Sequence, residues 1–430
     1  MYYLNVYHEH APVGILGYDE LEGRYTFSYE KNWQEDGFEL SPYLKFNSDI
    51  SSKSIRNFIE NLLPEGYALE QIIRQNNLSK NNFFGILNAI GIETTGALSF
   101  AVPDMTDFET TSFREITESE LAERIANRAD TPIAIWDHKP RISVAGVQDK
   151  LPITILDETF GFGSGRLAST HILKFSDEKE LVFNEYLSLT LAAAAGLNVA
   201  DSIIKNIGDE KVLFVTRFDR DYIDETYIKR KHIIDGCQAL DLPVSYKYEQ
   251  NLGNGRDVKD IREGVSFKKV FSLIKLCSAP ILAKKELITW VCVNLCLGNS
   301  DAHGKNISFM VTKERFELAP FYDIVNISVY EEAYDSGLAM AIDDAFVLDE
   351  LTAYDFSEFC LELKVSKKLF ATEFSRVSKV IKETFEKEET LILVEQHQKN
   401  DFYQLYKSDV VERIKRLTPV VQESIKVNVQ

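Results

Sequence analysis

The alternation of hydrophobic and polar positions divides the chain into a strand-rich first half and a helix-rich second half. A period of two predicts a strand, and apolar residues repeated at steps of three and four predict a helix. The predicted strands are residues 2–7, 13–18, 24–29, 97–102, 170–175, 199–207 and 211–218. The predicted helices are residues 54–63, 68–75, 83–90, 116–128, 178–195, 265–277, 283–297, 345–363, 366–388 and 409–416. This order predicts an α+β protein that is mostly helical from residue 264 onward.

Two segments between these elements bear on domain organisation. The stretch Pro103–Thr111, rich in acidic and hydroxyl side chains, predicts a linker and a domain boundary near residues 105–135. The segment Gly161–Arg166 is rich in glycine, but no helix pattern follows it. A dinucleotide-binding fingerprint needs a strand, glycines and a helix in that order, so we predict a flexible surface loop there.

Candidate chemistry is concentrated in the segment Leu295–Ile324, where two loops flank a predicted hairpin. The first loop carries Asp301 and Asn306 with the spacing D-x-x-x-x-N, and the second carries Asp323. Phosphoryl transfer needs a carboxylate that accepts the proton of the attacking hydroxyl, and an amide and a second carboxylate that hold magnesium. Asp301 alone fits an ordinary turn aspartate, whereas the three residues as a set predict a kinase site.

Residues upstream fit the same chemistry, each with a simpler alternative. Lys174 lies within a predicted strand, where its ammonium must face solvent or an anion such as an ATP phosphate. Glu185, on the next predicted helix, fits an ion-pair partner of Lys174 and equally a solvated helix glutamate. The turn between residues 141 and 155 fits a loop that covers phosphates, and also a plain hairpin.

Composition and charge narrow the function. The 430-residue chain is 45% hydrophobic, which suffices for large cores, and no apolar run approaches the roughly 18 residues of a membrane span. Its net charge of −19 argues against autonomous nucleic-acid binding, which needs a basic surface. The five cysteines are scattered and predict buried thiols in a reducing compartment. With no N-terminal signal pattern, we expect a cytoplasmic protein.

A series of short motifs runs along the chain in a specific order. They are FIENLLPE (58–65), ILNAIG (86–91), ISVAGVQDK (142–150), THILK (170–174), NEY (184–186), GLNVAD (196–201), RFDR (217–220), CQALDLP (237–243), KYE (247–249), SDAHGKNIS (300–308) and PFYDI (320–324). Together they resemble the HipA toxins, bacterial serine/threonine kinases of type II toxin–antitoxin systems. The resemblance covers about residues 1–330.

The resemblance implies a fold and a domain order. The implied fold is α+β and protein-kinase-like (HipA/PI3-4 kinase-like), two-lobed, with a small mixed α/β N-terminal domain and a helical C-lobe. The implied domains are residues 1–105 (N-terminal HipA-type domain), 106–135 (connecting segment), 136–220 (kinase N-lobe) and 221–430 (helical C-lobe with the catalytic and metal-binding loops).

It also implies roles for individual residues. Asp301 is expected to accept the proton, with Asn306 and Asp323 as metal ligands and Glu185 positioning Lys174. The expected ATP contacts are Ala145, Gly146, Val147, Gln148, Asp149 and Lys150 in the phosphate-covering loop, Lys174, the hinge residues Thr216, Arg217 and Phe218, and His303, Gly304, Lys305, Asn306, Tyr322 and Asp323. The family often has an acidic residue at the position of Thr216, and hinge contacts are largely through the backbone.

The implied function is that of a Mg-ATP-dependent serine/threonine protein kinase acting as a toxin, with ATP and Mg²⁺ as cofactors. Expected partners are a protein substrate such as an aminoacyl-tRNA synthetase and a HipB-like helix-turn-helix antitoxin, with DNA reached only through the antitoxin and no membrane involved. The family autophosphorylates a serine at the position of Ser143, which implies a self-inactivating switch. Two alternatives are a small-molecule or lipid kinase, and a weakly catalytic corepressor-type binding module.

Overall fold

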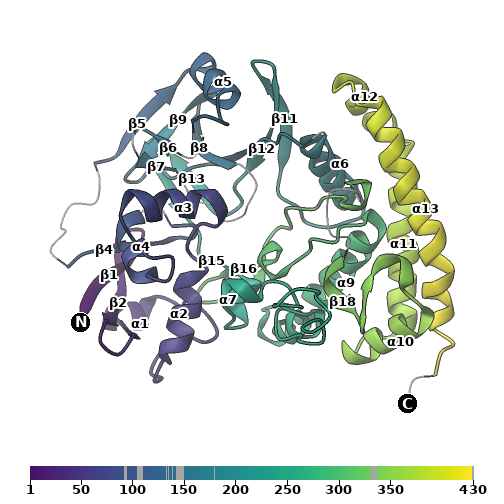
Figure 1. Ribbon diagram of the computed structural model, residues 1–430, viewed down its shortest axis with the longest axis horizontal. Helices are drawn as coiled ribbons and strands as arrows, with labels where there is room; N and C mark the ends of the chain where they lie inside the picture. Colours follow the sequence, from purple (N-terminus) through teal and green to yellow (C-terminus); the bar gives the residue numbers. More distant parts are fainter. Residues whose placement is uncertain are drawn as a thin grey trace. The chain divides into compact units, whose positions relative to one another are not determined.

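The computed structural model describes residues 1–91, 94–103, 110–131, 133, 135–137, 139–141, 150–178, 180–330 and 337–428. The chain folds into two compact units, whose elements are labelled in Figure 1. The first unit comprises Met1–Val182, Ala200–Val244 and Phe309–Phe316, and the second comprises Phe183–Val199, Ser245–Ser308 and Glu317–Gln430. The first contains most of the strands and the second the longest helices.

The N-terminal part of the first unit is a four-stranded antiparallel sheet in the order β3-β2-β1-β4, accompanied by short helices. The elements are β1 (Tyr2–His8), β2 (Ala11–Asp19), β3 (Arg24–Tyr29), α1 (Lys31–Asp36), α2 (Ser52–Glu60), α3 (Gly66–Gln75), α4 (Phe83–Ile90) and β4 (Leu98–Ala101). Helix α4 has the bounds that its apolar periodicity predicts, because the Asn82 side chain caps its first turn and Gly91 ends it.

Helix α2 attaches this N-terminal part to a later segment of the same unit. The Asn57 amide donates to the carbonyl oxygen of Asp241 at 2.7 Å, and the Ser54 hydroxyl donates to the Asp241 carboxylate at 2.9 Å. The Asn61 amide donates to the Leu242 carbonyl at 2.9 Å. These polar contacts explain why Asn57 of α2 and Asn61 just after it are buried although both are polar.

The second part of the first unit is built on a six-stranded antiparallel sheet in the order β11-β12-β10-β8-β9-β5. Its elements are β5 (Ser112–Ile116), α5 (Glu118–Ala126), β8 (Lys150–Leu156), β9 (Thr159–Ser164), β10 (His171–Lys174), β11 (Ser202–Ile207) and β12 (Glu210–Thr216). Leu121 and Ile125 of α5 pack with Ile153, Leu173 and Phe214 of the sheet in one apolar core.

The prediction of a surface loop at Gly161–Arg166 was wrong, because Gly161 and Gly163 lie in β9. A Cβ at Gly161 would lie 2.4 Å from the ring of Phe113, and a Cβ at Gly163 would lie 2.1 Å from the Leu167 carbonyl oxygen. The glycines therefore admit neighbouring groups close to the strand.

Short paired strands complete the sheets. They are β6 (Ile135–Trp136), β7 (Lys139–Pro140), β13 (Arg220–Asp224), β14 (Tyr227–Arg230), β15 (Ile233–Asp235), β16 (Ser308–Val311), β17 (Phe316–Leu318), β18 (Gly337–Ile342) and β19 (Ala345–Val347). Strands β16 and β17 are neighbours in one sheet and form the predicted hairpin.

The second unit is a helical assembly around α9 (Figure 1). Its helices are α6 (Leu181–Ala194, which begins in the first unit), α8 (Phe267–Ser272), α9 (Pro280–Leu297), α10 (Ala353–Glu362), α11 (Lys367–Phe385), α12 (Glu388–Gln396) and α13 (Asn400–Ser424); the short α7 (Gly236–Ala239) belongs to the first unit. Helix α9 contacts both α11 and α13, and its residues Leu287–Leu297 are all buried, as expected for the central part of such a helix.

The helix predicted over residues 345–363 was wrong at its start. Residues Ala345–Val347 form β19, which pairs with β18, and α10 begins only at Ala353 behind a Thr352–Asp355 capping box. All five cysteines are buried and free, as predicted. None of the helices in the described ranges has the length and hydropathy of a membrane span.

We expect the stability of the protein to fall as the pH drops from about 6.5 toward 4. His232 is buried beside Phe38, and its Nε2 pairs with the Leu40 carbonyl at 2.9 Å. Burial lowers the pKa of His232 from 6.5 to about 4, and the same cause lowers the pKa of His8 to about 4. Between these values the unfolded chain binds a proton that the folded chain does not, so acid favours unfolding by roughly 3 kcal/mol per fully buried histidine.

Urea unfolding at pH 7, 6, 5 and 4 measures how steeply the free energy of unfolding falls as the pH drops. His232→Gln, which can still donate to the Leu40 carbonyl, should flatten this slope, whereas the exposed His10→Gln should not. An unchanged slope in His232→Gln would contradict the prediction.

Candidate active site

The loop that carries Asp301 begins where α9 ends. Gly298 ends the helix in the left-handed region, with a φ of +72°, and a Cβ there would lie 2.5 Å from Ser328 Oγ. The next residue, Asn299, donates from Nδ2 to Asn294 Oδ1 at 2.8 Å, and its own Oδ1 accepts from the Asp301 backbone N–H at 3.3 Å. Because Asn299 is bonded to Asn294 of the helix and also accepts from the Asp301 N–H, the backbone of Asp301 has a defined place.

The same loop brings Asn306 to Asp301, as the D-x-x-x-x-N spacing predicts. The Asp301 carbonyl oxygen accepts from the His303 backbone N–H at 2.8 Å and from Asn306 Nδ2 at 2.8 Å. Lys305 donates its backbone N–H to His303 Nδ1 at 3.3 Å, within a short 3₁₀ turn over Gly304–Asn306. Because Nδ2 of Asn306 donates to the loop, Oδ1 of the same amide points in the opposite direction.

Tyr322 ties the second loop to the first. Its hydroxyl donates to the Lys305 carbonyl at 2.8 Å, so at its 2.7 Å contact with Ser308 Oγ it must accept. Phe321, one residue earlier, stacks on Trp290 of α9 with ring centroids 5.6 Å apart, and its backbone N–H donates to Asn198. Tyr322, the residue next to Asp323, is therefore held against the loop of Asp301.

Asp323 itself has a left-handed backbone, with a φ of +52°. Aspartate tolerates this region better than most residues that carry a Cβ. Three residues later, Asn326 and Asn184 of α6 exchange two hydrogen bonds of 2.9 Å, from Asn184 Nδ2 to the Asn326 carbonyl and from the Asn326 N–H to Asn184 Oδ1. This exchange fixes the chain that leaves Asp323.

Sequence reasoning missed these supporting residues. Asp409 of α13 accepts from Asn326 Nδ2 at 2.7 Å and is paired with Arg413 at 2.6 Å. The asparagine in the motif NEY was a visible signal for Asn184, but only helical character marked the region of Asp409. The C-terminal helix thus supports the loop of Asp323.

The donor set fits Mg²⁺ better than a metal held wholly by protein. Among the described residues, no group of three or more His, Cys, Asp or Glu side chains comes together as a metal cage. Asn306 and Asp323 instead offer an amide oxygen and a carboxylate on two loops that Tyr322 ties together. Mg²⁺ is commonly bound by one or two protein oxygens and completes its shell with water and substrate phosphates.

The predicted phosphate-binding lysines of the first unit lie side by side. Lys174 on β10 is the direct register partner of Lys150 on β8, so both side chains leave the same face of the sheet. Lys174 is 4% exposed. Two cations directly opposite one another repel, and nearby negative charge, such as that of a bound anion, would offset this repulsion.

The three residues of the predicted hinge differ in the exposure of their side chains. Thr216 ends β12 and is exposed, whereas Arg217 is buried and directs its guanidinium to Asp219, at 2.7 Å, and to Ser169, at 3.2 Å. Burial by itself would raise the pKa of Asp219, but Arg217 and Arg220 together hold that pKa well below its usual value. The Arg217 side chain thus belongs to a buried ion cluster, and a role of Arg217 in nucleotide binding through its backbone stays a prediction; Phe218 beside it is half-buried.

Glu185 is not the solvated helix glutamate of the simpler reading, because it is 2% exposed. Its pairing with Lys174 stays a prediction. The residues Ser143, Ala145, Gly146, Val147, Gln148 and Asp149 lie outside the described residues. The assignment of the phosphate-covering loop therefore rests on the sequence.

The chain is similar to known proteins over most of its length. Residues 4–101 match the HipA N-terminal domain family, and residues 142–388 match the HipA-like C-terminal domain family. The serine/threonine-protein kinase toxin HipA of Shewanella oneidensis is 40% identical over 412 residues, covering 96% of this chain and 95% of that protein. A putative kinase of Sinorhizobium fredii is 30% identical and covers 84% of this chain and 86% of its own length.

A solved structure extends the comparison to the whole fold. The HipA chain in a complex of Shewanella oneidensis HipA with HipB and operator DNA superposes with a TM-score of 0.89 at 38% identity, covering 99% of this chain and 100% of that one. The fold is thus the predicted α+β, two-lobed, kinase-like class, and the enzyme is a serine/threonine-protein kinase. The chain belongs to the HipA family.

Proposed function

We propose that this kinase transfers the γ-phosphoryl group of ATP to serine or threonine hydroxyls of a protein and acts as the toxin of a toxin–antitoxin pair in the cytoplasm. The observation that carries the proposal is the link between the two loops. Tyr322 bonds to Lys305 and Ser308, which holds Asp323 beside the loop of Asp301 and Asn306. A general base and two oxygen ligands in adjacent loops are what phosphoryl transfer requires.

In the proposed reaction the substrate hydroxyl oxygen attacks the γ-phosphorus of ATP. A new oxygen–phosphorus bond forms, the bond to the bridging oxygen breaks, and ADP leaves. Asp301 accepts the hydroxyl proton on its carboxylate. Lys150 and Lys174 face the phosphates, with Glu185 positioning Lys174, and Thr216, Arg217 and Phe218 meet the adenine through their backbone, while His303, Gly304 and Lys305 line the nucleotide site.

Asn306 and Asp323 would hold Mg²⁺, which neutralises phosphate charge when bound. The amide of Asn306 is oriented by its bond to the Asp301 carbonyl, and the backbone of Asp323 is left-handed. An amide that is oriented before nucleotide arrives reduces the ordering that binding would otherwise require.

The family relation supports the proposed partners. The solved relative was determined with HipB and operator DNA. We infer that a HipB-like helix-turn-helix antitoxin binds this chain too, and that DNA is reached through the antitoxin, because a net charge of −19 disfavours direct contact with DNA. The proposed substrate class is a translation protein such as an aminoacyl-tRNA synthetase.

Incubation of the purified kinase with γ-labelled ATP and a cell extract tests the proposal. We expect labelled proteins that carry phosphoserine or phosphothreonine, and none with an Asp301→Asn preparation. Label in lipids or small molecules alone would favour the small-molecule or lipid kinase instead. Growth arrest that persists with Asp301→Asn would favour the corepressor-type binding module.

We also propose that Ser143 is autophosphorylated. Phosphate adds nearly two negative charges beside a loop that would hold anionic phosphates, so the modified loop should leave the nucleotide site. Mass spectrometry of the protein expressed in cells should find phosphate on Ser143 in the active enzyme and not in Asp301→Asn. An unmodified Ser143 in an enzyme that phosphorylates other proteins would contradict this, as would full ATP affinity in Ser143→Asp.

A further inference from the structure

Tyr248 makes a direct contact with the proposed base. Its hydroxyl donates to Asp301 Oδ1 at 2.7 Å. The edge of its ring meets the ring of His303 with centroids 5.1 Å apart, and the Lys247 ammonium lies 5.6 Å from its centroid. A phenol that donates to a carboxylate at this distance makes a charge-assisted hydrogen bond, which is stronger and more directional than a neutral one.

The two neighbours of Tyr248 are linked to the backbone on either side of Asp301, Lys247 directly and Glu249 through Ala339. The Lys247 carbonyl accepts from the Gly304 N–H at 2.8 Å, in the catalytic loop itself. The Glu249 N–H donates to the Ala339 carbonyl at 2.9 Å, and the Ala339 N–H donates to the Ser300 carbonyl at 2.7 Å. Tyr248 therefore lies in a segment whose backbone is hydrogen-bonded to the loop of Asp301, directly and through Ala339.

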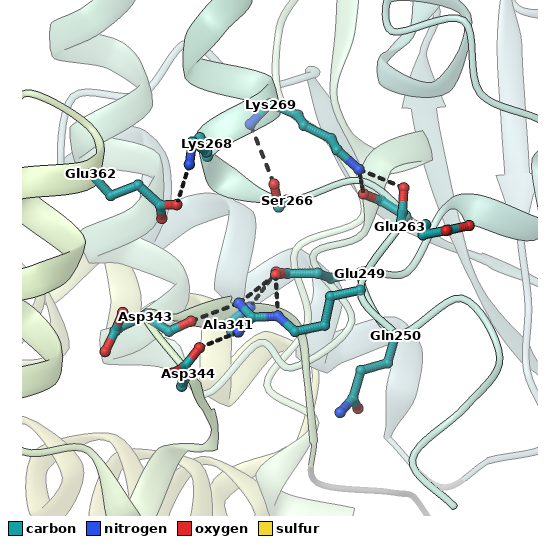
Figure 2. Close-up of polar contacts among 12 residues, drawn as sticks. Glu249, Gln250, Glu263, Ser266, Lys268, Lys269, Ala341, Asp343, Asp344 and Glu362 are labelled. Atoms are coloured by element: carbon teal, nitrogen blue, oxygen red, sulfur yellow. Dashed lines mark hydrogen bonds and ion pairs between the residues drawn. The ribbon is translucent and has the colours of Figure 1, made fainter. Parts of the chain in front are cut away.

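A charge pair between buried Glu249 and half-buried Arg262 holds that segment, and Figure 2 shows its surroundings. Glu249 is 3% exposed, and its Oε1 accepts from Arg262 Nε at 2.8 Å and Nη2 at 2.5 Å. Its Oε2 accepts from the Ala341 N–H at 2.9 Å, while Arg262 also donates to the Asp343 carbonyl at 2.7 Å and pairs with Asp344. We call Glu249 and Arg262 the clamp.

The segment that follows Arg262 passes very close to the backbone of Tyr248. The Gly264 N–H donates to the Glu249 carbonyl at 3.1 Å, and the Val265 N–H donates to the Tyr246 carbonyl at 2.8 Å. A Cβ at Gly264 would lie 1.7 Å from the Tyr248 carbonyl oxygen. Only glycine fits there, so the backbone of Tyr248 is confined on this side.

From this geometry we propose that Tyr248 is a positioning residue for Asp301 and that the clamp holds Tyr248 in place. The inference rests on the proposed role of Asp301 as the base. With Oδ1 engaged by the phenol, the carboxylate is fixed in one rotamer and Oδ2 is the oxygen that receives the proton of the substrate hydroxyl. Holding a base within a few tenths of an ångström of its working position raises the rate of the chemical step without changing nucleotide affinity.

Tyr248→Phe tests this, because it removes the hydroxyl and keeps the ring that packs on His303. We expect kcat to fall about tenfold, the lower end of what a hydrogen bond to a charged group contributes, with KM for ATP within about twofold of wild type. Tyr246→Phe is the matched control, because Tyr246 lies two residues away and its hydroxyl pairs with Glu263 at 3.2 Å. It should leave both constants unchanged.

A double-mutant cycle shows whether Tyr248 acts through Asp301. In single-turnover assays with labelled ATP, Tyr248→Phe should cause no further loss in the Asp301→Asn background. An unchanged kcat in Tyr248→Phe, or a raised KM for ATP at unchanged kcat, would overturn the positioning role and leave the role of Asp301 intact. Wild-type activity in Asp301→Asn would instead overturn the role of Asp301, and that of Tyr248 with it.

The clamp is tested by Arg262→Lys, which keeps a cation near Glu249 but loses the two-nitrogen contact with its Oε1. We expect a lower kcat in the wild-type background and no additional loss in the Tyr248→Phe background. Lys268→Gln breaks the nearby exposed pair with Glu362 (Figure 2) and should not change kcat in either background. Additive losses in Arg262→Lys and Tyr248→Phe would show that the clamp does not act through Tyr248.

Discussion

Asp301→Asn is expected to lower kcat for protein phosphorylation by about 10²–10⁴-fold, the usual contribution of a general base. The substitution keeps the size of the side chain and leaves the backbone contacts of residue 301 with His303 and Asn306 in place. Because a base acts mainly as the hydroxyl proton moves, Mg-ATP affinity should stay within about twofold of wild type. Steady-state kinetics and calorimetry with magnesium measure the two quantities separately.

Two outcomes of that experiment would contradict the assignment. A kcat close to that of wild type would show that Asp301 is not the base. A loss of Mg-ATP affinity as large as the loss of kcat would show that Asp301 acts in nucleotide binding. The thermal unfolding midpoint should match that of wild type, which excludes a folding defect as the cause.

Asp323→Asn is expected to weaken Mg-ATP binding by at least about 10–100-fold, and turnover with it, because a metal ligand acts before the chemical step. Asparagine tolerates the left-handed backbone of residue 323, so the loop should keep its conformation. Calorimetric titration with Mg-ATP measures the affinity. Asp157→Asn is the matched control, since Asp157 has a φ of +46° in an exposed turn of the first unit.

The contrast between the two variants is the sharper test. If Asp323→Asn binds Mg-ATP as tightly as wild type, Asp323 is not a metal ligand. If both variants lose affinity equally, the division of roles between the two loops is wrong.

Much of the local structure follows from the sequence, because short-range rules determine it. Helix α4 begins at an asparagine cap and ends at a glycine, and α9 ends before Gly298 as predicted, although it begins at Pro280, before the predicted start at residue 283. The residue types of the two loops are those that phosphoryl transfer needs, and the hairpin between them follows from alternation and its charged turn. These features depend on neighbours a few positions away.

The secondary-structure predictions were wrong where a partner distant in the sequence determines the local structure. Gly161 and Gly163 have the composition of a flexible loop, but pairing with β5 and β8 makes them part of a strand. Residues Ala345–Val347 continue a helical pattern, yet they pair with β18 as a strand. Propensity is a weak preference, and the hydrogen bonds of a sheet outweigh it.

The sequence by itself determined the family, the enzyme class and the residue types of the site, since an ordered set of motifs carries them. Only the tertiary structure decided what supports that site. Tyr248 and Asp301 are 53 positions apart, and Asn184 and Asn326 are 142 apart. No periodicity relates such residues, because a hydrogen bond between two loops depends on the folding of all the chain between them.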